Sequence, residues 1–149
     1  MAILLISAVS SIGGVNATTS KLRIVLDLSH GQDSSWSNLQ ALMANFEGNL
    51  TTGGYSVVWA RGGLNDSVLA DAQFLFLGSV YGKNLTDPEV NAIVNWFRQG
   101  EKTIWVAGDS DYQTFPGGDY IDDNMNKVLM MIGSRLRLEN TAVQDPISN

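Results

Sequence analysis

Residues 22–32 read LRIVLDLSHGQ, and this stretch decides the fold. Its first part is apolar and partly β-branched, and it ends in a polar loop that contains Gly31 and the single histidine of the chain, His30. A short apolar run bounded in this way is typical of a strand buried on both faces of a parallel sheet. Alternating helical and strand patterns follow toward the C-terminus, so we expect this strand to be the first and central one.

Further strand patterns and helical patterns alternate along the rest of the chain. The strands are expected at 55–59, 74–77, 103–107 and 136–138, and the helices at 36–50, around Val68 and Leu69, at 86–100 and at 121–132. Strands that are separated by helices need crossover connections, which predicts a parallel sheet with helices on both faces. Thr86-Asp87-Pro88-Glu89 is a capping box with proline in the first turn, and it fixes the start of the third of these helices.

Composition sets limits on the domain count and on the class of partner. At 149 residues and 44% hydrophobic, the chain is long enough for one α/β domain and too short for two. A net charge of −6 argues against a surface that neutralises phosphate backbones, so nucleic acid is not an expected partner. The chain has no cysteine, which excludes disulfides, thiol nucleophiles and thiolate metal sites.

The N-terminal segment, residues 1–20, differs in character from the domain expected at 21–149. It begins with Ala2-Ile3-Leu4-Leu5-Ile6 and reaches Val15-Asn16-Ala17, so it resembles a secretion signal without a basic start. It is short for a membrane span, which needs about 20 apolar residues. We expect either a signal or anchor, or an element that packs on this or a neighbouring subunit, and any membrane contact or homo-oligomer would be made through it. No helix pattern follows the fifth strand, which suggests a domain truncated there or a piece of a longer protein.

Asn-x-Ser/Thr sequons are more frequent than chance predicts. They begin at Asn16, Asn49, Asn65 and Asn84. Such sequons accept N-linked glycans in secreted proteins, so together with the apolar N-terminus they favour an extracellular or membrane-attached glycoprotein on the outer face.

The order of strand, Leu85-Thr86-Asp87-Pro88-Glu89 helix, Gly100, strand and Gly108 resembles the class I glutamine amidotransferase-like superfamily. More narrowly it is similar to the noncatalytic domains of gliding-motility and intraflagellar-transport type, which also occur beside ABC-type transporters. The resemblance implies a flavodoxin-like, doubly wound α/β fold with strand order 2-1-3-4-5 and three layers. It does not imply amidotransferase activity, because the cysteine elbow and the His-x-Glu pair are absent and Gly108-Asp109-Ser110 stands nearest to the elbow position.

A candidate binding site is expected where the strand order reverses, beyond the carboxyl ends of the strands. The polar residues that we expect to line it are His30, Gln32, Asp33, Ser79, Tyr81, Asp109, Ser110 and Asp111. Such a set suits a small polar molecule or a sugar, and we expect neither a cofactor nor a metal.

Two catalytic alternatives use the same loops. His30 and Ser110 with a carboxylate could form a hydrolase triad, but Gly108 to Tyr112 lacks the Gly-x-Ser-x-Gly elbow. Asp109 and Asp111 could hold Ca²⁺ or Mg²⁺ through oxygen ligands, although no EF-hand spacing is present. We expect instead that His30 bonds locally, that Asp27 is a buried structural carboxylate, and that Trp36, Trp59, Trp96 and Trp105 pack in the core.

The sequence therefore predicts a noncatalytic extracytoplasmic domain that binds a protein partner or a small ligand in a transporter-associated or cell-surface glycoprotein. Two other functions stay open: a structural subunit of an extracellular filament or surface layer assembled through residues 1–20, and a hydrolase that uses His30 and Ser110 or a metal at Asp109 and Asp111.

Overall fold

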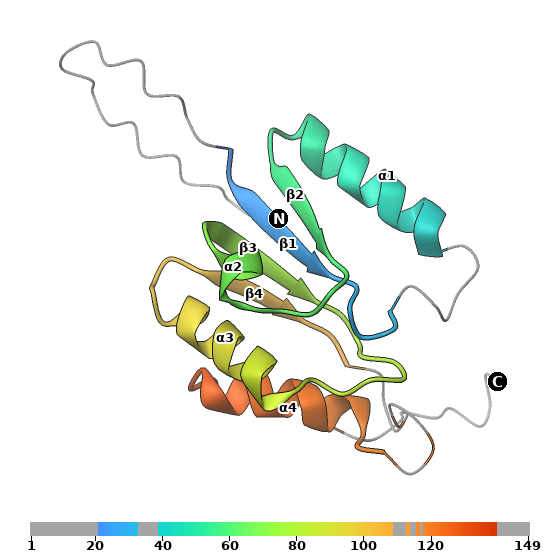
Figure 1. Ribbon diagram of the computed structural model, residues 1–149, viewed down its shortest axis with the longest axis vertical. Coiled ribbons are helices and arrows are strands. Elements are labelled where there is room, and N and C mark those ends of the chain that lie inside the picture. Colours follow the sequence, from blue (N-terminus) through green and yellow to red (C-terminus); the bar gives the residue numbers. More distant parts are fainter. Residues whose placement is uncertain (1–20, 33–38, 109–112, 114–115, 117, 140–149) are drawn as a thin grey trace, which may run out of the picture.

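The computed structural model describes residues 21–32, 39–108, 113, 116 and 118–139. Strands and helices alternate throughout this part of the chain (Figure 1). The elements are β1 (Arg23–Asp27), α1 (Leu39–Thr52), β2 (Ser56–Ala60), α2 (Asp66–Leu69), β3 (Ala72–Leu77), α3 (Asp87–Phe97), β4 (Thr103–Val106) and α4 (Ile121–Met131). Among the described residues, no helix is both long and apolar enough to cross a membrane.

The strands form one parallel sheet in the order β2-β1-β3-β4. β1 is central, as the apolar run at 22–28 predicted, and its Val25 is fully buried. The register places Val25 beside Val58 of β2 and Leu75 of β3, and Leu75 beside Ile104 of β4. The predicted α/β class with a parallel sheet is confirmed, and it is consistent with a flavodoxin-like kind of fold.

The expected order 2-1-3-4-5 is wrong in one respect: among the described residues, the sheet has four strands and not five. Residues 136–138 form no strand because the side chain of Asn126 in α4 takes both backbone groups of Leu138. The Leu138 amide donates to Asn126 Oδ1 and Asn126 Nδ2 donates to the Leu138 carbonyl, each at 2.8 Å. Among the described residues, therefore, no strand covers the outer edge of β4.

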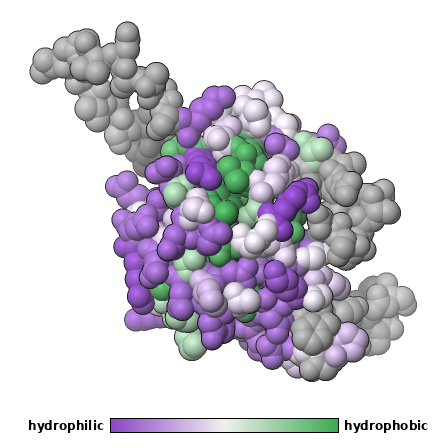
Figure 2. Space-filling model, viewed as in Figure 1, coloured by the Kyte–Doolittle hydropathy of each residue, from purple (hydrophilic) through white to green (hydrophobic). Residues whose placement is uncertain are grey.

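The two faces of the sheet are covered unequally. One face packs against α3 and α4, and its core includes the buried Val25, Leu75, Ile93 and Met125. Figure 1 shows α1 on the opposite side, which we call the α1 face. Figure 2 shows hydrophobic residues gathered over the strands near the middle of the view, whereas the surface over α3 and α4 is largely polar.

A row of apolar side chains crosses the α1 face from β2 to β4. The register aligns Trp59, Leu26, Phe76 and Trp105. Phe46 of α1 lies 5.6 Å from Phe76 between ring centroids, and Leu26 is fully buried. Trp105 stacks on Phe76 at 3.9 Å but keeps 43% of its surface exposed, which departs from the expectation that it packs in the core.

Candidate functional site

A cluster of three ionisable side chains joins the loops at the carboxyl end of the sheet. Asp27 is the last residue of β1, His30 lies in the loop that follows, and Glu89 lies in the first turn of α3. His30 is fully buried, and Asp27 and Glu89 are buried as well. Charged groups this far from water must be paired to be tolerated.

Asp27 accepts hydrogen bonds on both carboxylate oxygens. Oδ1 accepts from the Ser29 amide at 3.0 Å and from Ser29 Oγ at 2.5 Å. Oδ2 lies 2.8 Å from His30 Nδ1 and accepts from Gln32 Nε2 at 2.9 Å. The prediction that Asp27 is a buried structural carboxylate and that His30 bonds locally agrees with these contacts.

Glu89 closes the cluster from the other side. Its Oε2 lies 3.3 Å from His30 Nε2, which is an ion pair without the alignment of a hydrogen bond. The same oxygen accepts hydrogen bonds from the Thr86 amide at 2.9 Å and from Thr86 Oγ1 at 2.7 Å. Its Oε1 accepts from the Leu64 amide at 3.3 Å. One carboxylate thus completes the predicted capping box of α3, pairs with the histidine and ties down the loop after β2.

The charges of the cluster support each other. Burial alone would lower the pKa of His30, but the hydrogen bond and charge of Asp27 and the charge of Glu89 outweigh burial and raise that pKa above its ordinary value. Burial would likewise raise the pKa of Asp27, yet bonds from His30 and Ser29 hold it below its ordinary value. Burial would also raise the pKa of Glu89, but the bonds from Thr86 and the charge of His30 outweigh burial and lower this pKa to about 2. These shifts all favour an imidazolium between two carboxylates.

Gly63 leaves the space that Glu89 occupies. It has φ +104°, and a Cβ atom built there would lie 2.8 Å from Glu89 Oε1. A side chain at this position would meet both backbone strain and a steric clash. The neighbouring Gly62 has open space around it.

The cluster lies where the strand order reverses, between β1 and β3, which is the usual ligand position in open α/β sheets. Here the buried side chains of Asp27, His30 and Glu89 occupy that position. Of the predicted lining residues, His30 is buried, whereas Gln32, Ser79 and Tyr81 are half-buried. The Tyr81 amide donates to the His30 carbonyl at 2.6 Å, and Gln32 Oε1 accepts from the His30 amide at 2.9 Å. Asp33, Asp109, Ser110 and Asp111 lie outside the described residues.

The two catalytic alternatives rest partly on those same residues. Ser110, Asp109 and Asp111 are not described, so neither the triad nor the metal site is tested by geometry. Within the described part of the chain, no group of three or more His, Asp or Glu side chains is placed to hold a metal ion. His30 itself faces a carboxylate at each ring nitrogen, an arrangement that fixes the ring and leaves no lone pair directed at solvent.

Comparison of the chain with protein-family models, with curated proteins and with solved structures gave no match.

Sequence reasoning assigned Glu89 to the helix cap alone and missed its contact with His30. The residues lie far apart in the chain, and only the packing of α3 against the sheet brings them together. The available signal was Glu89 itself: an acidic residue at the third position of an otherwise apolar helix face has to find buried donors.

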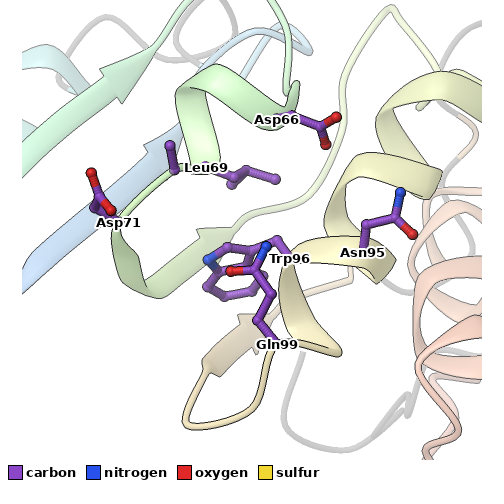
Figure 3. Close-up of a pocket in the computed structure, with 7 residues that line it drawn as sticks. Asp66, Leu69, Asp71, Asn95, Trp96 and Gln99 are labelled. Atoms are coloured by element: carbon purple, nitrogen blue, oxygen red, sulfur yellow. The ribbon is translucent and has the colours of Figure 1, made fainter.

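A cavity of about 440 Å³ lies at the opposite end of the sheet. Figure 3 shows it between α2, which contributes Leu69 and Asp66, and the end of α3, where Asn95 and Trp96 lie in the last turn and Gln99 follows the helix. Trp96 is buried, and its indole nitrogen donates to the Ala72 carbonyl at 2.9 Å. The indole ring therefore braces the start of β3 and offers no open face to a ligand.

The sequons occupy different settings. Asn49 and Asn65 are exposed, near the end of α1 and at the N-cap of α2. Asn65 uses only its side-chain oxygen, which accepts from the Val68 amide at 3.0 Å and from Ser67 Oγ. Asn84 is half-buried and its Nδ2 donates to Asp119 at 2.9 Å, so a glycan there would have to fit beside this bond. Asn16 lies outside the described residues.

Proposed function

We propose that this chain is a noncatalytic binding and interaction domain whose protein partner docks on the uncovered half of the α1 face, along β4. The observation that carries the proposal is Trp105. It is a large aromatic residue on an edge strand, stacked on Phe76 and 43% exposed, in the same row as the fully buried Leu26.

The apolar row that crosses the α1 face is covered by α1 over only part of its length. α1 shields the β1 and β2 side of the α1 face and reaches as far as Phe76. Beyond Phe76 the row continues to Trp105 without cover from the described residues. Exposed aromatic side chains that continue a core mark docking sites, and an open strand edge offers backbone groups for strand addition. We infer that the partner is an extended segment with apolar side chains.

The buried cluster supports a noncatalytic role. The histidine that a hydrolase would need as a base is held between two carboxylates and has no exposed surface. Its contacts instead lock three loops at the carboxyl end of the sheet, which makes the domain a rigid platform. This is the arrangement expected of a binding scaffold rather than of a titrating catalyst.

We further propose that the domain lies on the outer side of a membrane as part of a glycosylated, transporter-associated or cell-surface protein. The apolar residues 1–20, the sequons and the resemblance to noncatalytic amidotransferase-like domains support this setting. Asn49 and Asn65 are the better glycan acceptors because both are exposed, whereas the Asn84 amide is engaged.

A second candidate function is a structural subunit of a filament or surface layer. The edge of β4 favours it, because no strand of the described residues pairs with this edge and such an edge can receive a strand from a neighbouring subunit.

The proposal is tested with a phage-displayed library of short linear peptides selected on the purified full chain. Selected peptides are titrated calorimetrically against the wild type, Trp105→Ser and Met130→Ser. Met130 is the matched control because it is 59% exposed but lies on α4, on the other side of the sheet. We expect apolar peptides whose affinity falls at least about tenfold with Trp105→Ser, a loss of about 1.4 kcal/mol, and stays unchanged with Met130→Ser. Equal affinity for both variants, or no selected peptide, would overturn the proposal.

A further inference from the structure

We propose that the cavity between α2 and α3 binds a linear aliphatic diamine, with one ammonium group at Asp66, the other at Asp71 and the methylene chain between them. The cavity has a volume of about 440 Å³ and both aspartates line it. The inference is independent of the proposed function, because it involves neither the edge of β4 nor Trp105.

The two carboxylates stand at different ends of the lining. Figure 3 shows Asp66 and Asp71 apart, with Leu69 between them. Asp66 is the first residue of the short helix α2, and Ala70 after the helix has an extended backbone with ψ 136°. The Cα atoms of the two aspartates are therefore on the order of 10 Å apart. Two acids spaced in this way suit a ligand with two separated positive charges rather than a single ion.

The cations nearest to the cavity are engaged with backbone carbonyls. The guanidinium of Arg23 donates from Nη1 to the Ala70 carbonyl at 2.8 Å. Lys102 Nζ donates to the Ala72 carbonyl at 2.7 Å. Neither carboxylate of the cavity forms a hydrogen bond or an ion pair with a described residue. Both are therefore available to the ammonium groups of a ligand, which are donors only.

The rest of the lining suits a methylene chain with ammonium ends. Leu69 and Trp96 supply its apolar part, and the indole nitrogen of Trp96 is already bonded to the Ala72 carbonyl, so it adds no free donor. Asn95 and Gln99 are exposed at the rim, and their amide oxygens can accept further hydrogen bonds from an ammonium group. No described residue that lines the cavity is basic, so the lining favours a cation over an anion.

The inference is tested by titrating hexamethylenediamine into the full chain at low ionic strength, followed by NMR of the backbone amides. Hexylamine, which has one ammonium group, and hexanediol, which has none, serve as ligands of matched length. We expect the diamine to shift the amides of residues 66–71 and 95–99 with a Kd below about 1 mM. Hexylamine should bind at least about threefold more weakly and hexanediol at least about tenfold more weakly, because each lost ammonium removes an ion pair. Shifts confined to other residues, or hexylamine binding as tightly as the diamine, would overturn the inference.

Two conservative variants separate the cavity from a general attraction to an acidic protein. Asp66→Asn and Asp71→Asn each remove one charge, and asparagine tolerates the left-handed φ of +58° at Asp71. Glu139→Gln is the matched control, since it removes one exposed charge that does not line the cavity. We expect each asparagine variant to bind the diamine at least about threefold more weakly and the control to differ from wild type by less than about 1.5-fold. Equal weakening in all three variants would show that only the net charge of −6 attracts the diamine, and it would overturn the inference.

Discussion

Glu89→Gln tests the buried ion cluster because it removes one charge and keeps the shape of the side chain. The glutamine oxygen can keep the bonds from Thr86, but its amide group then faces the Leu64 amide, which is a donor as well. Leu64 is 2% exposed, so its amide would lose its partner in a buried position. His30 would lose one of its two carboxylates at the same time.

The magnitude follows from the contacts that the substitution removes. An orphaned buried donor together with a broken buried ion pair costs about 3 kcal/mol. For a chain of this size, that loss lowers the melting temperature by about 9 °C.

The assay is calorimetric melting of the wild type, Glu89→Gln and the control Glu139→Gln, which makes the same chemical change at an exposed position. The difference between wild type and Glu89→Gln should be largest near pH 6 and should shrink as the pH falls toward 2, because the wild-type carboxylate then becomes protonated. A Glu89→Gln variant that melts within about 1 °C of the control at pH 6 would refute the account of the cluster.

Further predictions concern the same cluster. Because the pKa values of Asp27 and Glu89 are lowered, their contribution to stability is present above about pH 4.5 and is lost as the pH falls through their folded values. The pKa of His30 is raised, so its contribution to stability is present below about pH 6.5 and is lost as the pH rises through its folded value. The free energy of unfolding, measured with urea, should therefore be largest between these two pH limits. His30→Gln should remove the decline of that free energy at alkaline pH. Gly63→Ala should lower the free energy of unfolding by about 1–3 kcal/mol in the same urea measurement, whereas the control Gly62→Ala should lower it by less than about 0.5 kcal/mol. Equal effects of the two substitutions would show that Glu89 does not need the space at Gly63.

Much of the fold could be predicted from local signals. The capping box at Thr86 and Glu89 fixed the start of α3, and the apolar run after Lys21 gave the central strand. The prediction of a fifth strand was wrong because it depends on a contact with another element. The side chain of Asn126 bonds to the amide and the carbonyl of Leu138, and nothing near Leu138 in the sequence signals this.

The site was predicted only in part, for the same reason. The loop that carries His30 could be placed at the strand ends, but its burial depends on Glu89, which approaches from another element. The exposure of Trp105 was missed because strand alternation shows which side chains share a face and not which part of that face another element covers.

The most direct test of the docking surface is amide hydrogen exchange of β4 in the full chain, measured by NMR with and without a saturating selected peptide. We expect the outward amides of Ile104 and Val106 to slow by at least about tenfold when the peptide binds, because they gain hydrogen bonds, while the Trp105 amide, which points toward β3, stays unchanged. Saturating peptide that leaves the exchange of Ile104 and Val106 unaltered would contradict the claim that partners add to this edge.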